Sequence, residues 1–96
     1  MFIIMSEYLK PADFIDTFLD AHRLFLDEYI RKGVILVAGR KVPRTGGVIL
    51  AKGKTKEEVE RFMREDPFSI NRIARYEIVE FIPTKIAKGL ESLLQD

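Results

Sequence analysis

The sequence predicts an α+β domain in which a four-stranded antiparallel sheet carries helices on one face. Three observations predict it: a long amphipathic stretch over residues 11–33, apolar runs of strand length on both sides of that stretch and again near residue 80, and a capping pattern that starts a second helix at Thr55. With 96 residues, of which 47% are hydrophobic and 32% charged, we expect one domain over residues 1–96.

The first strand and the long helix form the beginning of the chain. Residues 2–8 are short and apolar, which favours a strand. In residues 11–33 the apolar side chains recur at spacings of three and four, which predicts one helix. Pro11 suits the first turn of this helix and Gly33 suits a left-handed stop. The apolar stripe consists of Phe14, Ile15, Phe18, Leu19, Phe25, Leu26, Tyr29 and Ile30.

Two strands joined by a basic turn follow the long helix. Residues 34–39, with the sequence VILVAG, form a continuous apolar run that contains three β-branched side chains. Residues 40–47 carry three positive charges, a proline and two glycines, which indicate a turn. Residues 48–51 then continue as the third strand, so that a hairpin is the simplest connection.

The second half of the chain repeats the order of a helix and a strand. Thr55 and Glu58 form a capping box at the start of a helix over residues 55–65. Asp66 and Pro67 end this helix, because the residue before a proline is disfavoured in helical torsions. The remaining predicted elements are a short turn over residues 68–72, a fourth strand over residues 76–82 and a helical tail within residues 84–96.

The order of the predicted elements is strand, helix, strand, strand, helix, strand. This order is typical of the ferredoxin-like arrangement, in which two split βαβ units form one antiparallel sheet. Two helices cover one face of such a sheet, yet three of the strands carry apolar residues at both alternating positions. The uncovered face is therefore expected to be apolar, and we predict that a second copy covers it in a homodimer.

Composition and charge exclude several classes of function. The net charge of +1 gives no general attraction to nucleic acid or to an anionic membrane. No apolar run is long enough to span a bilayer, and the apolar start of the chain lacks the features of a signal peptide, so a cytoplasmic protein is expected. The chain has no cysteine and one histidine, which makes a metal site unexpected. Neither a dinucleotide-binding motif nor a P-loop is present, so no nucleotide cofactor is expected.

The histidine, His22, lies on the apolar face of the predicted long helix. It is three residues from Leu19 and Phe25, so its ring points inward with them. A neutral core imidazole explains such a position. An acid/base group in a cleft also explains it, because histidine titrates near neutral pH and can hold one partner while it acts on another.

Asp66 is the acidic residue with the most unusual position, between a helix end and a proline. It could cap the backbone of the turn that follows it. It could also reach His22, because the two crossover helices of this fold lie side by side, and a carboxylate there would fix the imidazole tautomer. We therefore predict His22 and Asp66 as a catalytic pair and keep both interpretations of each residue.

The basic turn supplies candidate ligand-binding residues. Arg40, at the end of the second strand, could bind a carboxylate or phenolate, and Gly39 and the pair Gly46-Gly47 could let the backbone approach a ligand. We also expect Tyr8 and Pro67 to contribute to ligand binding. For Lys41 and Arg44 a solvated turn is the favoured interpretation. No serine lies in a nucleophile-elbow pattern, which argues against covalent hydrolysis.

Taken together, these residues resemble the YCII-related (YciI-like) proteins, which are small ferredoxin-like domains that form dimeric α+β barrels. The resemblance rests on His22 in AHRLFLDEYIRKG, on the strand LVAGR and on EDPFSI after the second helix, and it extends to about Pro83. Family proteins carry a histidine and an aspartate at the positions of His22 and Asp66, which are viewed as a probable active-site pair. Many relatives have a proline where this chain has Arg40, and residues 84–96 are not explained by the resemblance.

The resemblance implies a function in small-molecule metabolism. Some relatives are associated with dehydrochlorination of hydroxylated aromatic compounds, a reaction that needs proton transfer and no redox cofactor. The leading hypothesis is therefore a cofactor-independent lyase or isomerase that acts on a small molecule. A non-catalytic module that binds a small molecule, or acts in an interaction, is the alternative. Nucleic-acid binding is disfavoured, because it requires a basic sheet with stacking aromatics.

Overall fold

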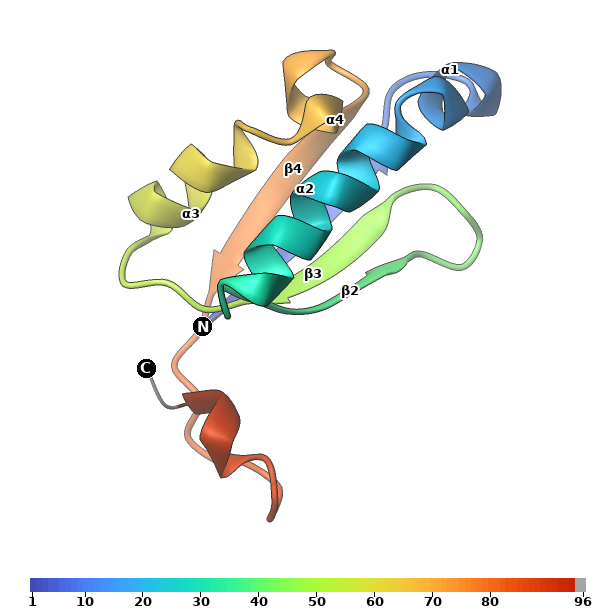
Figure 1. Cartoon of the computed structure of the whole chain (residues 1–96). Coiled ribbons are helices and arrows are strands. Elements are labelled where there is room, and N and C mark those ends of the chain that lie inside the picture. The colour runs from blue at the N-terminus through green and yellow to red at the C-terminus, as the bar shows by residue number, and fades with distance from the viewer. Residues whose placement is uncertain (95–96) are drawn as a thin grey trace.

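The computed structural model describes residues 1–94 and has a four-stranded sheet with its helices on one face (Figure 1). The strands lie in the order β2-β3-β1-β4, and every neighbouring pair is antiparallel. The predicted ferredoxin-like α+β fold is therefore confirmed. Its elements are β1 (Phe2–Tyr8), α1 (Ala12–Thr17), α2 (Leu19–Arg31), β2 (Ile35–Arg40), β3 (Gly47–Ala51), α3 (Lys56–Met63), α4 (Pro67–Ile70), β4 (Ala74–Glu80) and the 3₁₀ turn η1 (Glu91–Leu94).

The prediction of one helix over residues 11–33 is wrong in one respect, because the helix is interrupted at Phe18. The hydroxyl of Thr17 donates to the carbonyl oxygen of Asp13 at 3.1 Å, and the N–H of Phe18 bonds to Ile15, three residues back. A threonine that bonds back to the preceding turn bends a helix. Two residues that the predicted stripe placed inside, Phe14 and Ile30, are 43% and 46% exposed.

The second half of the chain follows the predicted pattern closely. The hydroxyl of Thr55 accepts the N–H of Glu58 at 3.1 Å, which confirms the capping interaction at the start of α3. The predicted turn over residues 68–72 is the short helix α4. Strand β4 begins at Ala74, earlier than predicted, because its pairing with β1 extends to Tyr8.

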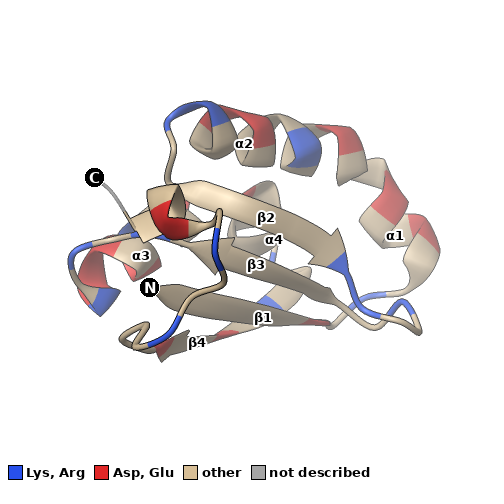
Figure 2. Ribbon diagram, turned by 90° about the horizontal axis from the view of Figure 1, so that it is seen from below, with Lys and Arg blue, Asp and Glu red and all other residues tan. Residues whose placement is uncertain are grey.

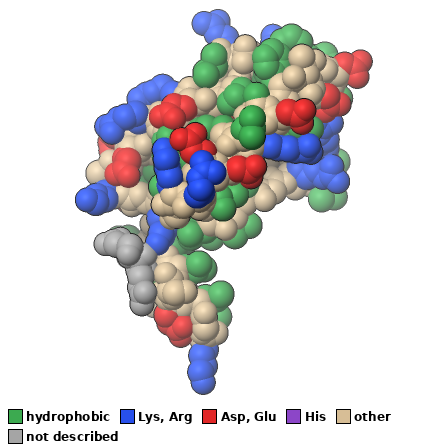
Figure 3. Space-filling model, viewed as in Figure 1, with side chains coloured by type: hydrophobic (Ala, Val, Ile, Leu, Met, Phe, Trp, Pro, Cys, Tyr) green, Lys and Arg blue, Asp and Glu red, His purple; other side chains and the backbone are tan. Residues whose placement is uncertain are grey.

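The tail is the second point of difference from the sequence prediction. Within the described part of residues 84–96 only η1 is helical, and it is a 3₁₀ turn. Gly89 has a φ of +97°, which is incompatible with a continuous α-helix. The tail extends away from the body of the domain and carries exposed apolar side chains, Ile86 and Leu90 among them (Figures 1 and 3). Residues 95 and 96 of the predicted tail lie outside the described residues.

The core lies between the sheet and the helices and has two parts. The larger part includes Phe2, Ile4 and Val59, and the smaller part is centred on Phe68 and Ile73 near the start of β4. The open face of the sheet, which no helix covers, exposes Val37, Val48 and Val79 by 61%, 39% and 40%. This face has the apolar character that was predicted, and the homodimer stays a prediction.

Candidate active site

A cavity of about 440 Å³ lies under α2, on the helix side of the sheet. Its walls come from α1, α2, α4 and all four strands, so residues far apart in the sequence meet there. Apolar groups such as Leu19, Leu26 and Ile49 form part of the wall, and His22, Ser6 and Tyr8 supply polar groups. A volume of this size and a mixed lining are typical of sites for small molecules.

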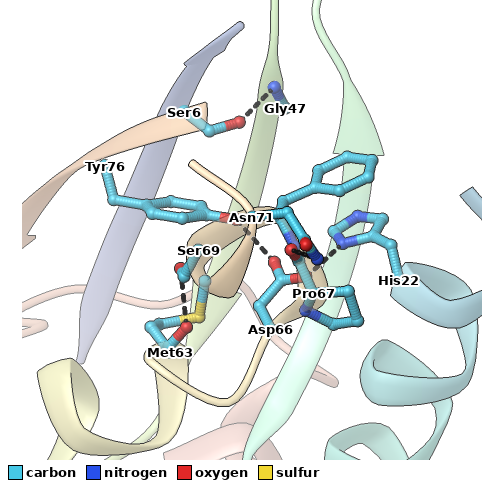
Figure 4. Close-up of polar contacts among 10 residues, drawn as sticks. Ser6, His22, Gly47, Met63, Asp66, Pro67, Ser69, Asn71 and Tyr76 are labelled. Atoms are coloured by element: carbon cyan, nitrogen blue, oxygen red, sulfur yellow. Dashed lines mark hydrogen bonds and ion pairs between the residues drawn. The ribbon is translucent and has the colours of Figure 1, made fainter. Parts of the chain in front are cut away.

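His22 lies on α2 at the wall of this cavity, and its ring is held on two sides (Figure 4). Its Nδ1 is 2.8 Å from Oδ1 of Asp66. The ring also stacks in parallel on Phe68, with 3.9 Å between the centroids. The side chain of His22 is 16% exposed, whereas that of Asp66 is fully buried. The imidazole is therefore fixed in orientation while one edge stays accessible.

Asp66 accepts three hydrogen bonds from three different elements. Oδ1 receives the Nδ1–H of His22 and the backbone N–H of Phe68, the latter at 3.0 Å. Oδ2 receives the hydroxyl of Tyr76 at 2.5 Å. Asp66 is also the N-cap of α4, with Pro67 in the first helical position. The cap and the histidine partner, which the sequence left as alternatives, are therefore the same carboxylate.

This set of donors determines the chemistry that His22 can perform. Three donors converge on Asp66, so the group acts as an acceptor at each contact, as a carboxylate does. Nδ1 of His22 then carries a proton, and Nε2 is left as the basic nitrogen. Among residues 1–94, Nε2 has no hydrogen-bond partner. Burial, together with the Asp66 charge, raises the pKa of Tyr76 far above its ordinary value, so Tyr76 stays a neutral donor.

The structure places the predicted ligand-binding residues in different surroundings. Tyr8, Gly39 and Arg40 line the cavity. Pro67 does not line it: it begins α4 behind Asp66, and its carbonyl oxygen accepts the side-chain N–H of Asn71 at 2.8 Å. Of the three glycines at the basic turn, Gly39 and Gly47 line the cavity, whereas Gly46 does not.

The glycine pair after the basic turn has a packing role. A Cβ atom on Gly46 would lie 1.8 Å from the carbonyl oxygen of Ser6, so any side chain there would clash with the backbone of β1. The N–H of Gly47 donates to the hydroxyl of Ser6 at 2.8 Å (Figure 4). These contacts bring the β2–β3 loop against β1. Arg44 of this loop lines the cavity, where it pairs with Asp16 of α1 at 2.6 Å.

Three residues of the site were missed by the sequence analysis: Ser6, Phe68 and Tyr76. Ser6 and Tyr76 are paired across β1 and β4 and point to the helix side. The signal was present, because Ser6 is a polar residue at the inward position that Phe2 and Ile4 occupy earlier in the same strand. Phe68 was read as part of a turn, and its stacking on His22 has no signature in the sequence.

Two searches of the described residues gave negative findings. Among residues 1–94, no group of three or more histidine, cysteine, aspartate or glutamate side chains is placed to hold a metal ion. In the same part of the chain, no helix has the length and apolar character required to cross a membrane.

Comparison with solved structures identifies a similar fold in an enzyme. The chain superimposes with a TM-score of 0.69 on 5-chloro-2-hydroxyhydroquinone dehydrochlorinase (TftG) from Burkholderia phenoliruptrix AC1100, in complex with 2,5-dihydroxybenzoquinone. The match covers 85% of this chain and 94% of the dehydrochlorinase, at 18% sequence identity. Identity at this level shows a shared fold. A search of curated protein sequences finds no match.

Comparison with family models gives the assignment. The model of the YCII-related domain matches residues 1–82, which is every element from β1 to β4. The matched region includes His22, Asp66 and the whole lining of the cavity, and it ends before the tail. The chain belongs to the family of YCII-related domains.

Proposed function

We propose that this protein is an enzyme that transfers a proton on a small organic molecule, in a lyase reaction such as dehydrochlorination or in an isomerisation. His22 is the general acid/base, and Asp66 holds it in position. The observation that carries the proposal is the state of the His22 ring, which lines the cavity. Its Nδ1 bonds to the buried carboxylate of Asp66, and its Nε2 has no hydrogen-bond partner among residues 1–94.

The proposed reaction uses the two nitrogens of His22 in different ways. Nε2 takes a proton from a C–H or O–H group of the substrate, and the resulting imidazolium is stabilised by the Asp66 carboxylate. In an elimination the electron pair of the broken bond expels the leaving group, and the proton departs with it as acid. In an isomerisation Nε2 returns the proton to another atom of the substrate. Neither reaction adds electrons to the substrate or removes them from it overall, so neither needs a redox cofactor.

Two further features support the proposal. The structurally similar protein is named as a dehydrochlorinase and holds a hydroxylated quinone, which is a ligand small enough for a cavity of about 440 Å³. The ring of His22 is also restrained by Phe68, so its orientation does not have to be fixed when substrate binds. We therefore take a hydroxylated aromatic ring as the first substrate to test.

The state of His22 is tested by ¹⁵N NMR of its ring nitrogens across pH, which is unambiguous because the chain has one histidine. The wild type is expected to show the tautomer protonated at Nδ1 and to titrate. In Asp66→Asn the midpoint of titration and the tautomer balance are expected to change. Tyr76→Phe, which leaves the contact between His22 and Asp66 in place, serves as a second variant. A ring that never titrates and ignores Asp66 would contradict the proposal.

Activity is tested by chloride release from 5-chloro-2-hydroxyhydroquinone and from related hydroxylated aromatics. His22→Asn is expected to lower turnover by about 10²- to 10⁴-fold, the usual contribution of a general acid/base. Tyr29→Phe, on the same helix and outside the cavity lining, is the matched control and should retain activity. Unchanged turnover in His22→Asn would overturn the assignment. Saturable binding of 2,5-dihydroxybenzoquinone without turnover of any compound would favour the binding module.

A further inference from the structure

The mouth of the cavity carries more positive than negative charge. Three arginines line it, Arg23 from α2, Arg40 from the end of β2 and Arg44 from the β2–β3 loop. Asp16 is the one carboxylate among the described residues of the lining. Figure 2 shows the basic end of β2 and the loop beside it turned toward the acidic ribbon of α1.

The three arginines differ in how far their charge is neutralised. Arg44 is paired with Asp16 at 2.6 Å, and its guanidinium lies 5.9 Å from the ring centroid of Tyr8. Arg23 has only a contact at 4.0 Å with Asp20, which is fully exposed. Arg40 has no acidic partner and no hydrogen bond from its side chain to any residue between 1 and 94. Within residues 1–94 neither Arg23 nor Arg40 makes a side-chain hydrogen bond, and Arg40 is the arginine of the lining that also has no acidic partner.

The remaining charge near the cavity does not compensate Arg40. Asp66 is buried behind His22, and its oxygens already accept three hydrogen bonds. The register of the sheet explains the position of Arg40, which pairs with Gly47 and projects to the same side as Ser6. A guanidinium at the rim of a partly apolar cavity favours a planar anion that accepts two parallel hydrogen bonds.

We infer that the cavity takes an organic anion, a carboxylate or phenolate on an apolar ring, with its charged group on Arg40 and its ring between the apolar walls. The inference rests on the proposed function only for the position of the reacting atom beside His22. Leu19, Leu26 and Phe68 provide the apolar surface for the ring. The hydroxyl of Ser6 accepts the N–H of Gly47 and keeps its own proton for a second polar group of the ligand.

The inference is tested by binding rather than turnover. The probes are benzoate, its neutral analogue benzamide and inorganic phosphate, each titrated into ¹⁵N-labelled protein at about pH 8, where an ordinary imidazole is neutral. Benzoate is expected to bind with at least about tenfold higher affinity than benzamide or phosphate, and to shift the amide signals of Gly39 and Gly47. Equal binding of benzamide would show that charge is not recognised. Equal binding of phosphate would show that the apolar walls are not used.

Variants of neighbouring residues assign the charge to Arg40. Arg40→Gln is expected to weaken benzoate binding by about 10- to 100-fold. Lys41→Gln removes the same charge one residue away, outside the cavity lining, and should change the affinity by less than about threefold. Asp16→Asn removes the one carboxylate in the described lining, whose negative charge repels a bound anion, and is expected to strengthen binding. Equal losses in Arg40→Gln and Lys41→Gln would overturn the inference.

The two proposals fail separately in this design. His22→Asn should still bind benzoate at about pH 8, because the anion rests on Arg40 rather than on the imidazole. Benzoate binding that depends on Arg40, together with an inert His22, would leave the anion site standing and remove the acid/base assignment. Turnover that depends on His22, without preference for anions and without effect of Arg40→Gln, would leave the acid/base assignment standing and remove the anion site.

Discussion

Two hydrogen-bonded pairs join α2 to the segment that follows α3, and only one of them faces a cavity. Tyr29 donates to Glu65 at 2.7 Å, and His22 donates to Asp66 at 2.8 Å. The acceptors are consecutive residues, and the donors are seven residues apart, which places them on the same face of α2 two turns from each other. The two pairs therefore have the same architecture at the two ends of one helix.

The surroundings of the two pairs differ. Tyr29 is packed on Phe62 with 4.7 Å between ring centroids, and Nζ of Lys32 lies over the Tyr29 ring at 4.6 Å from its centroid. Its acceptor, Glu65, is exposed to solvent. The His22 pair has a fully buried acceptor, and the free edge of its ring lines a cavity. A buried carboxylate is costly unless it is fully hydrogen-bonded, and Asp66 meets this condition beside an open cavity. The Tyr29 pair has the surroundings of a packing contact, whereas those of the His22 pair fit the role proposed for it above.

The largest difference between the pairs is expected when the acceptors are removed. Asp66→Ala leaves three donors in the protein interior without a partner, and we expect it to lower the free energy of unfolding by about 3 kcal/mol. Glu65→Ala frees one donor beside solvent and should cost about 1 kcal/mol or less. Urea unfolding of both variants measures this, and each removes one negative charge, so they control each other. Equal losses would show that burial does not distinguish the pairs.

Removal of a hydrogen-bond donor is also expected to destabilise the protein more at Asp66 than at Glu65, with smaller losses of unfolding free energy than removal of the acceptors. Tyr76→Phe leaves Oδ2 of the buried Asp66 without its hydrogen bond, and we expect a loss of about 2 kcal/mol. Tyr29→Phe leaves Glu65 free to bond with water and should cost about 0.5–1 kcal/mol. Both substitutions delete one hydroxyl, which makes them a matched pair in urea unfolding. A larger effect of Tyr29→Phe would contradict the ranking.

Alkaline pH distinguishes the two tyrosines in another way. Burial, reinforced by Glu65, raises the pKa of Tyr29 from 10.0 to about 12, and burial near Asp66 raises that of Tyr76 further. For each tyrosine the pKa in the folded protein exceeds that in the unfolded chain. The stabilisation that the neutral tyrosine provides is therefore complete below pH 10 and is lost as the pH rises. Between its unfolded and its folded pKa, each tyrosine should lower the free energy of unfolding by on the order of 1 kcal/mol per pH unit.

The effects of Tyr29 and Tyr76 on the free energy of unfolding are expected to differ at the highest pH values. The contribution of Tyr29 should level off near pH 12, whereas that of Tyr76 should continue beyond it. Urea midpoints measured at steps from about pH 9 upward in the wild type, Tyr29→Phe and Tyr76→Phe test this. Each variant should show a shallower loss above pH 10 than the wild type. A wild-type slope retained in both variants would show that neither tyrosine is responsible.

The sequence was sufficient for the fold and for the two central residues of the site because both depend on local patterns. Thr55 with Glu58 marks a helix start, and alternation marks the strands, without knowledge of the tertiary structure. His22 and Asp66 stood out because each is a polar residue at a position where the pattern requires an explanation. A contact between them was one of two interpretations, drawn from the side-by-side packing of the crossover helices, and the structure has it at 2.8 Å.

The rest of the site depends on contacts that no local pattern encodes. Tyr76 bonds to Asp66 only because the register of β4 against β1 places it on the helix side. At the break at Phe18, the hydroxyl of Thr17 bonds to the carbonyl oxygen of Asp13, within a stretch whose periodicity still fits a single helix. The same limit applies to Arg40, whose lack of an acidic partner in the described chain becomes visible only when every nearby carboxylate has been placed.

The smallest effect is expected from a third pair, Arg44 and Asp16, which lies at the same cavity as His22 but is exposed. The side chains are 33% and 53% accessible, so water screens the 2.6 Å contact and replaces it when it is broken. Asp16→Asn should lower the urea midpoint less than any substitution above, and by still less in high salt. Urea unfolding at two ionic strengths measures this. A loss as large as that of Asp66→Ala would mean that proximity to the cavity, rather than burial of the carboxylate, sets the energy of these pairs.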